Sequence, residues 1–224
     1  ELQWRTPTEA PRAVLLHGEC GSGKSRVARA LHCDGPRRGA GFVAFDARGL
    51  SAGDIEARLF GAGGPNGVQQ QGHGLLAAAE GGRLYIRELA EVPLHVQGRL
   101  VEQIDGASDV QLIAGSRRNP ERLAASDACL PTLAAGAATS TFALPPLRER
   151  GDDTCLLARR FMHAVAEDRG LLLPAWDRTV APALLRHGWP GNVRELRHVM
   201  ERALFVQRDG VIDGADLRLD LPQA

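Results

Sequence analysis

Gly18-Glu-Cys-Gly-Ser-Gly-Lys-Ser25 is the stretch on which the fold of this chain depends. It follows an apolar run over residues 13–16 and precedes a helical pattern over residues 26–32. The stretch has two glycines separated by four residues, followed by Lys-Ser, and it lies between a strand and a helix. This is the pattern of a phosphate-binding loop. Glycines let backbone N–H groups converge on an anion, and the helix N-terminus adds partial positive charge. The stretch therefore predicts an α/β fold built around a phosphate site.

The residues of this loop have distinct expected roles. Lys24 is expected to reach the β- and γ-phosphates, and the Ser25 hydroxyl to hold Mg²⁺. Lys24 is the single lysine among 27 lysine and arginine residues, which suits a position where a compact ammonium serves better than a planar guanidinium. A glycine-rich turn with a chance Lys-Ser pair is the alternative interpretation. The predicted nucleotide-binding residues here are Gly18, Glu19, Cys20, Gly21, Ser22, Gly23, Lys24 and Ser25.

Length and composition limit the classes of protein that this chain can belong to. With 224 residues, 44% of them hydrophobic, it is long enough for one α/β domain and a small appendage. The 27 acidic residues balance the 27 basic ones, so no global positive field favours nucleic acid. No apolar run approaches the ~20 residues that span a bilayer, and the polar start lacks a signal-peptide core. Four scattered cysteines without a CxxC pair indicate a reducing cytoplasm.

Strand and helix patterns alternate along the chain as far as Pro146. Short apolar runs indicate strands over residues 13–17, 42–45, 83–88, 110–114 and 142–144. Helical spacing indicates helices over residues 26–32, 54–60, 75–80 and 93–105, and later over 154–169, 177–187 and 193–206. Alternation of this kind predicts a parallel five-stranded sheet covered on both faces, with ligands at the carboxyl ends of its strands. We expect a linker over residues 1–12, an α/β nucleotide-binding core over 13–146 and a small all-helical lid over 147–224.

Several further motifs occur in a fixed order along the chain. After the loop come Glu56-Ala-Arg-Leu-Phe-Gly61, Gly81-Gly-Arg-Leu-Tyr-Ile-Arg-Glu88, Leu112-Ile-Ala114, Leu144-Pro-Pro-Leu-Arg-Glu-Arg150 and Trp189-Pro-Gly-Asn-Val-Arg-Glu-Leu196. Together they resemble the AAA+ domain of sigma-54-dependent transcription activators, also called bacterial enhancer-binding proteins. The resemblance covers almost the whole chain, and its last two motifs are highly specific. It implies a ring-forming P-loop ATPase that remodels a polymerase holoenzyme. DNA would bind through a helix-turn-helix domain, which we interpret as absent from this chain.

Departures from the family pattern begin at its Walker B strand. The family has Asp-Glu there, with the Asp positioning Mg²⁺ and the Glu polarising the attacking water, and this chain has Arg87-Glu88. One charge pair at ~4 Å and an effective dielectric of ~20 is worth ~4 kcal/mol, so the reversed charge should weaken Mg²⁺ binding. Arg87 could contact phosphate, pair with Glu19 or Asp46, or point away and only pack. Glu88 remains the candidate catalytic residue of a degenerate site.

Other departures also concern ATP turnover. The family's Asn that restrains the catalytic Glu is matched by Asp46, and its Ala-Thr-Asn sensor is matched by Gly115-Ser116-Arg117. Arg117, like Arg87, is therefore a candidate phosphate contact. The two arginine-finger positions fall near Leu130 and Gly136, and arginine fingers contribute ~10³–10⁵ to turnover in related phosphoryl transfer. Loss of the arginine fingers together with the Walker B Asp therefore predicts hydrolysis near background.

The loop with which the family contacts sigma-54 is also altered. Residues 62–73 replace the family's Gly-Ala-Phe-Thr-Gly-Ala and contain neither Phe nor Thr. Because the apolar tip is missing, we do not expect contact with sigma-54. Self-association as a dimer or ring and contact with RNA polymerase are the partners that the resemblance still implies.

The nucleotide-binding half of the pattern is retained. The loop is intact, and Arg194 matches the family's second sensor, which reaches the γ-phosphate; an ordinary helix-surface arginine is the alternative. We expect a domain that binds ATP or ADP, with weakened Mg²⁺ binding and impaired or absent hydrolysis. Three alternatives stay open: a slow but genuine ATPase that uses Glu88, a cyclic di-GMP-responsive domain in which Arg87 and Arg117 contact phosphate, and a nucleotide-free oligomerisation scaffold.

Overall fold

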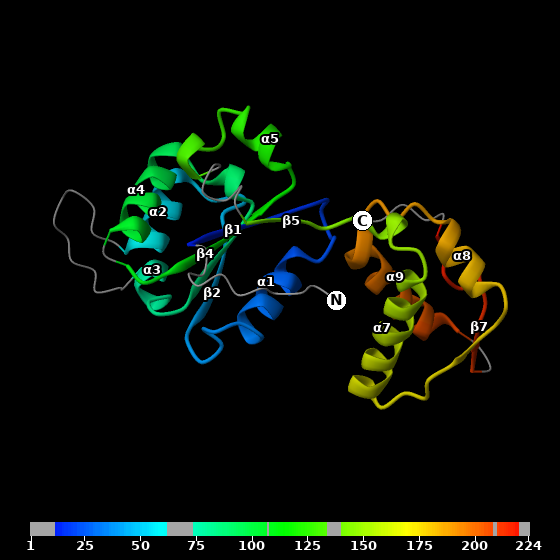
Figure 1. Cartoon of the computed structure of the whole chain (residues 1–224). Helices are drawn as coiled ribbons and strands as arrows, with labels where there is room; N and C mark the ends of the chain where they lie inside the picture. The colour runs from blue at the N-terminus through cyan, green and yellow to red at the C-terminus, as the bar shows by residue number, and fades with distance from the viewer. Residues whose placement is uncertain (1–11, 62–73, 107, 134–139, 208–209, 220–224) are drawn as a thin grey trace. The chain divides into compact units, whose positions relative to one another are not determined.

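The computed structural model describes residues 12–61, 74–106, 108–133, 140–207 and 210–219. Three sequence-based predictions fall outside these ranges: the linker before residue 12, the replaced loop of residues 62–73 and the arginine-finger position near Gly136. The chain divides into two compact units (Figure 1). The core unit comprises Glu1–Gly18 and Lys24–Leu144, and the lid unit comprises Glu19–Gly23 and Pro145–Ala224.

The core unit is built on a five-stranded parallel sheet. In spatial order its strands are β2 (Phe42–Asp46), β3 (Arg83–Arg87), β4 (Gln111–Ser116), β1 (Ala13–His17) and β5 (Thr141–Ala143). All four neighbouring pairs run parallel, so the predicted sheet is confirmed. Carboxyl ends of parallel strands meet at one edge of a sheet, and the phosphate-binding loop follows β1 at that edge.

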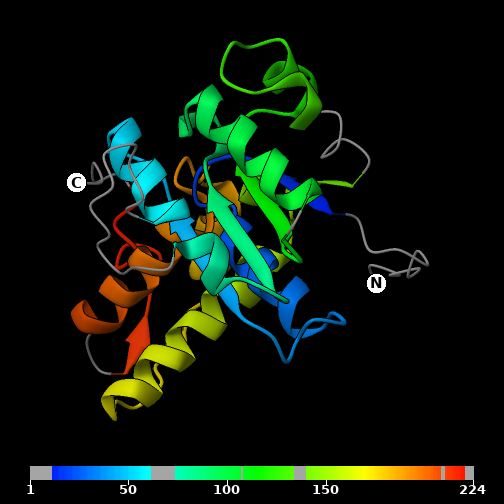
Figure 2. The same cartoon turned by 90° about the vertical axis from the view of Figure 1, so that its left-hand side faces the viewer.

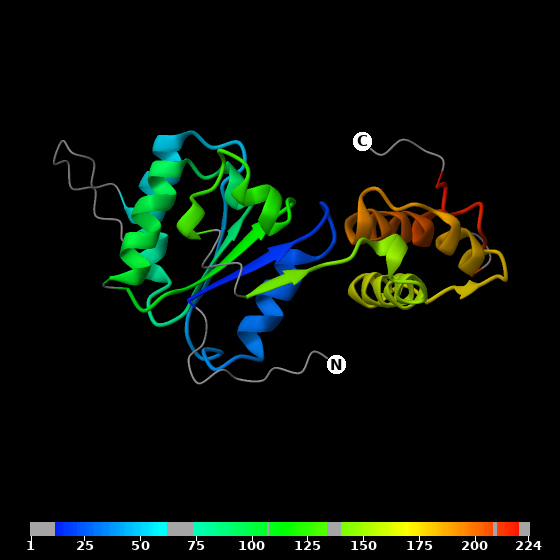
Figure 3. The same ribbon diagram turned by 45° about the horizontal axis from the view of Figure 1, so that its top comes forward.

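Alternating side chains divide the sheet into two buried faces. One face carries Leu15, Leu84, Ile86, Leu112 and Ala114 and packs against α2 (Ala52–Phe60) and α4 (Leu94–Asp105). The other face carries Val14, Leu16, Tyr85 and Ile113 and packs against α1 (Lys24–Cys33). Figure 3 shows α1 and α4 on opposite sides of the sheet, and Figure 2 looks onto the α2 and α4 side. Each buried Leu or Ile stabilises this arrangement by about 1.5–3 kcal/mol.

Element boundaries differ from the sequence-based ones in two informative places. The third strand ends at Arg87, one residue before the predicted end, because Glu88 takes a left-handed conformation with φ 60°. A short helix, α5 (Pro120–Ala124), was not predicted, although its start carries the usual signals. The Asn119 side chain accepts a hydrogen bond from Arg122 N at 2.9 Å, and Pro120 opens the helix. The four-residue helix α3 (Leu75–Ala78) also belongs to the core unit.

The lid unit is dominated by three helices: α7 (Asp153–Arg169), α8 (Val180–Arg186) and α9 (Asn192–Val206). Trp189 lies at the centre of their core with 1% of its surface exposed, and its Nε1 donates to the Leu184 carbonyl at 2.8 Å. The prediction of helices alone after Pro146 needs one correction. Two-residue parallel strands, β6 (Ala175–Trp176) and β7 (Val211–Ile212), pair where the segments before α8 and after α9 run side by side. Two residues are too short for a recognisable alternation.

Candidate functional site

The predicted phosphate-binding loop has the backbone of a tight anion-binding turn. Gly21 and Gly23 have φ angles of 77° and 106°, which glycine tolerates far better than other residues. Gly18 N is anchored by a hydrogen bond to the Ser116 carbonyl at 3.1 Å, and α1 begins at Lys24. The strand–loop–helix context required by the motif is therefore present. Residues 19–23 group with the lid unit, and the two ends of the loop group with the core unit.

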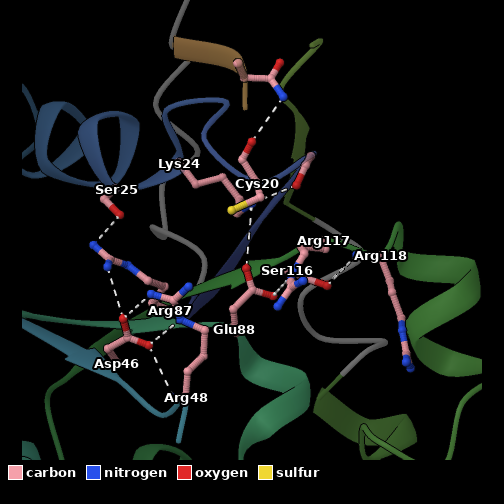
Figure 4. A network of polar contacts seen from close by, with 12 residues as sticks. Cys20, Lys24, Ser25, Asp46, Arg48, Arg87, Glu88, Ser116, Arg117 and Arg118 are labelled. Atoms are coloured by element: carbon pink, nitrogen blue, oxygen red, sulfur yellow. Dashed lines mark hydrogen bonds and ion pairs between the residues drawn. The ribbon is translucent and has the colours of Figure 1, made fainter. Parts of the chain in front are cut away.

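In the core unit, the candidate catalytic carboxylate lies between two cations. Glu88 is 7% exposed, and its Oε1 lies 3.8 Å from Lys24 Nζ. Its Oε2 lies 3.4 Å from Nε of Arg117, the residue at the family's sensor position. Lys24 is also buried and donates to the Gly18 carbonyl at 2.7 Å. Figure 4 shows Glu88 directed toward both cations. Each oxygen of this carboxylate therefore has a cation within ion-pair distance.

Arg87 points into the site and joins two residues there. Its Nη1 donates to Asp46 Oδ2 and its Nη2 donates to Ser25 Oγ, both at 3.0 Å (Figure 4). Of the alternatives that the sequence left open, pairing with Asp46 is the one that the structure contains. Glu19 instead pairs with Arg148 at 2.6 Å, within the lid unit. The position that carries a metal-side carboxylate in the family thus presents a guanidinium to the Ser25 hydroxyl.

Two residues that the sequence analysis did not single out complete this cluster. Tyr85 OH lies 3.3 Å from Ser25 Oγ, and burial raises the pKa of Tyr85, so the phenol keeps its proton at neutral pH. Arg48 donates from Nε and Nη2 to the two oxygens of Asp46, at 2.9 and 2.7 Å. Tyr85 could have been found because it lies two residues before Arg87, on the same face of the strand. Arg48 has no such signal beyond its closeness to Asp46 in sequence.

The pKa of Asp46 offers a direct check on this geometry. Hydrogen bonds from Arg48, with a smaller contribution from Arg87, lower it from 3.8 to about 2. Because the pKa of Asp46 is lower in the folded chain than its ordinary value of 3.8, the ionised carboxylate stabilises the fold at pH values above 3.8. This stabilisation is lost as the pH falls through about 2. We expect Arg48→Ala to raise the pKa of Asp46 more than Arg87→Ala does, because Arg48 donates more hydrogen bonds. Carboxyl-carbon NMR titration of the three proteins measures this order, and the reverse order would contradict it.

In the lid unit, residues 19–23 are fastened to the motif around α9. Asn192 is fully buried, and its Nδ2 donates to the Cys20 carbonyl at 3.1 Å and to Glu19 Oε2 at 3.0 Å. Val193 N donates to the Gly21 carbonyl at 3.1 Å. A Cβ on Gly21 would come within 2.1 Å of the Gly191 carbonyl oxygen, so the approach is open only to glycine.

Two arginines of the lid unit also contact this loop segment. Arg194, the predicted second sensor, donates from Nη1 to Cys20 Sγ at 3.3 Å. Arg150 donates from Nη2 to the Ser22 carbonyl at 2.7 Å. Ser22 is 1% exposed, and its Oγ has no hydrogen-bond partner among the residues that the structure describes. A buried hydroxyl of this kind fits an anion-binding loop, because a phosphate oxygen can accept its proton.

The fold and the loop define a class before any comparison is made: a P-loop NTPase core of the AAA+ type with a helical lid. The model of the sigma-54 interaction domain matches residues 3–127, and the model of the AAA+ ATPase lid domain matches residues 148–224. The chain therefore belongs to the sigma-54 interaction domain family. Proteins of this kind are bacterial transcription regulators, and the chain corresponds to their AAA+ domain.

Relatives and solved structures agree with this assignment. The Nif-specific regulatory protein of Azospirillum brasilense is 35% identical over 222 residues, covering 93% of this chain and 35% of that protein. The C4-dicarboxylate transport regulator DctD of Pseudomonas aeruginosa is 36% identical over 203 residues, covering 84% and 44%. A crystal structure of NtrX from Brucella abortus in complex with ADP is 27% identical with a TM-score of 0.80, covering 94% and 51%; an ATP complex matches equally well. The chain thus spans about a third to a half of the length of these proteins.

In the ranges that the structure describes, no helix is both long enough and apolar enough to cross a bilayer.

Proposed function

We propose that this domain binds ATP or ADP as a regulatory ligand in a bacterial transcription regulator, with little or no hydrolysis. The observation that carries the proposal is the position of Glu88. A catalytic carboxylate must accept a hydrogen bond from the attacking water. Here both of its oxygens face cations, Lys24 at 3.8 Å and Arg117 at 3.4 Å. Two cations at these distances offset part of the negative charge with which Glu88 would polarise a water, which favours binding over turnover.

Nucleotide binding itself is supported by features of the chain and by a relative. The left-handed Gly21 and Gly23, the Ser22 hydroxyl and Lys24 fit a phosphate group. The similar NtrX protein of Brucella abortus has been solved with ADP and with ATP. When bound, the nucleotide would supply a polyphosphate anion to these donors, and the chain would hold it rather than cleave it. Because Arg194 matches the family's second sensor in sequence, we propose that it contacts the nucleotide as well.

The regulatory role follows from the family. A ligand that binds one assembly state more tightly stabilises it, by about 2.7 kcal/mol at 100 times its dissociation constant. We propose that nucleotide biases self-association of this domain as a dimer or ring in the cytoplasm. Contact with RNA polymerase is part of the proposal, and sigma-54 contact is not, because the sequence of residues 62–73 lacks the family's Phe and Thr. Binding to DNA is assigned to a separate helix-turn-helix domain.

A calorimetric titration with ATP tests the proposal. We expect saturable binding, weakened about 10- to 100-fold by Lys24→Ala, because a hydrogen bond to a charged group contributes about 1.5–3 kcal/mol. Arg26→Ala is the matched control, since it removes an exposed cation two residues further along the same helix, and it should bind as the parent does.

Two outcomes would count against the proposal, one in a phosphate-release assay and one in the titration. Steady phosphate release that disappears in Glu88→Gln would establish a working ATPase. Absence of saturable ATP binding would remove the nucleotide role, and titration with cyclic di-GMP would then distinguish another phosphate ligand from an empty scaffold.

A further inference from the structure

We propose that the Arg87 guanidinium takes the place of the divalent cation, so that this site accepts the phosphates of a nucleotide free of metal. The inference rests on the proposed nucleotide binding and specifies the chemical form of the ligand. It concerns only residues of the core unit. Its consequence is that Mg²⁺ competes with the protein for the nucleotide instead of assisting its binding.

The first observation behind this inference is that Arg87 contacts Ser25. Ser25 is the residue whose hydroxyl holds the cation in a phosphate-binding loop of this pattern. Arg87 Nη2 donates to that oxygen at 3.0 Å, and the hydroxyl of Tyr85, two residues earlier on the same strand, lies 3.3 Å from it. The Ser25 hydroxyl is therefore already engaged by a cationic group. A divalent ion coordinated there would have to displace the guanidinium and remain next to its positive charge.

The second observation is that the carboxylates near Ser25 already face cationic side chains. Mg²⁺ in nucleotide sites is held through one or two carboxylates with the substrate phosphates. Asp46 is bonded to Arg48 and Arg87, and Glu88 faces Lys24 and Arg117. The residues present thus do not fit Mg²⁺.

The third observation is that the guanidinium group can itself bind phosphate oxygens. Arginine has five N–H donors in a planar fork that matches phosphate oxygens, and it stays charged at all relevant pH values. Its bonds to Asp46 and Ser25 use one donor from each terminal nitrogen. The side chain remains 37% exposed, so further donors can reach a ligand. Asp46, in register with Arg87 on the adjacent strand, holds the fork in this orientation.

The test compares ATP binding by calorimetry in EDTA and in excess Mg²⁺. For the parent chain we expect a dissociation constant about tenfold lower in EDTA, since excess Mg²⁺ converts free ATP to its metal complex. In the double variant Asp46→Asn with Arg87→Asp, which restores a metal-side carboxylate, the order should reverse. Arg87→Gln should weaken binding in EDTA and remove most of the difference between the two conditions.

Arg118→Gln is the matched control, because Arg118 follows the neighbouring strand β4 and its side chain points away from the cluster in Figure 4. It should keep the parent's preference for EDTA. Parent binding that requires or is strengthened by Mg²⁺ would overturn this inference and leave nucleotide binding intact. An equal effect of Arg118→Gln and Arg87→Gln would also overturn it, since the effect would then be one of overall charge. No saturable binding in either condition would overturn the proposed function, and this inference with it.

Discussion

Replacing Trp189 with alanine is expected to lower the free energy of unfolding of the lid unit by about 3–5 kcal/mol, the usual cost of deleting a buried aromatic side chain. Trp189 is 1% exposed, and the His187 ring lies edge-on to it at 4.5 Å between centroids. Truncation leaves a cavity at the centre of three helices. It also leaves the Leu184 carbonyl, which accepts the indole N–H at 2.8 Å, without that donor.

Hydrogen exchange of the α9 amides under native conditions measures the effect in the lid unit specifically. Phe205→Ala is the control, because Phe205 is an aromatic residue of α9 whose surface is 54% exposed. This substitution should lower the free energy of unfolding by less than about 1 kcal/mol. Trp189→Phe should fall between the two, since it keeps a buried ring and loses the hydrogen bond. Equal losses for Trp189→Ala and Phe205→Ala would show that burial of the indole does not hold the unit together.

The second large effect is expected for Asn192→Ala, at about 2–4 kcal/mol, because removing one partner leaves buried groups unsatisfied. The Asn192 side chain is fully buried, and its Oδ1 accepts from Leu147 N at 2.7 Å. Its Nδ2 donates to the Cys20 carbonyl and to Glu19, so the loop segment 19–23 loses two of its hydrogen bonds to α9. Alanine is also strained at this position, where φ is 52°.

Chemical denaturation gives the loss in stability, and ATP calorimetry shows whether the loosened loop binds more weakly. Gln207→Ala is the matched control: it removes a carboxamide from the other end of the same helix, where Gln207 makes an exposed bond to Gly210 N. Its cost should be within about 0.5 kcal/mol. A parent-like stability of Asn192→Ala would mean that the three bonds contribute little to the lid unit.

Local signals explain why the core could be predicted from sequence. Buried parallel strands are short apolar runs, and each one here is separated from the next by a helical or glycine-rich stretch. The position of each strand can therefore be predicted without knowing which strand it pairs with. The loop motif added the direction of the sheet, because it must follow a carboxyl end. The helix after Asn119-Pro120 carried a readable signal that the sequence analysis did not use.

Side-chain partners could not be derived in the same way. Arg87 had several carboxylates within sequence reach, and only the register of β2 against β3 brings Asp46 beside it. Glu19 was a candidate for the same role, yet it pairs with Arg148, which is 129 residues away. The left-handed backbone of Glu88 likewise depends on its packing and ion pairs. The sequence shows which kinds of side chain are present, and the folded structure determines which of them come into contact.

The pairing of Asp46 with Arg87 has an evolutionary consequence. A single reversal of Arg87 to aspartate would set two carboxylates in register on adjacent strands, next to each other at the edge of the site, and one of them would be pushed toward protonation. The two positions are therefore epistatic: the fitness effect of changing one depends on the other. A carboxylate at position 87 is therefore expected to be tolerated best when Asp46 is changed as well, so the two residues would be replaced together.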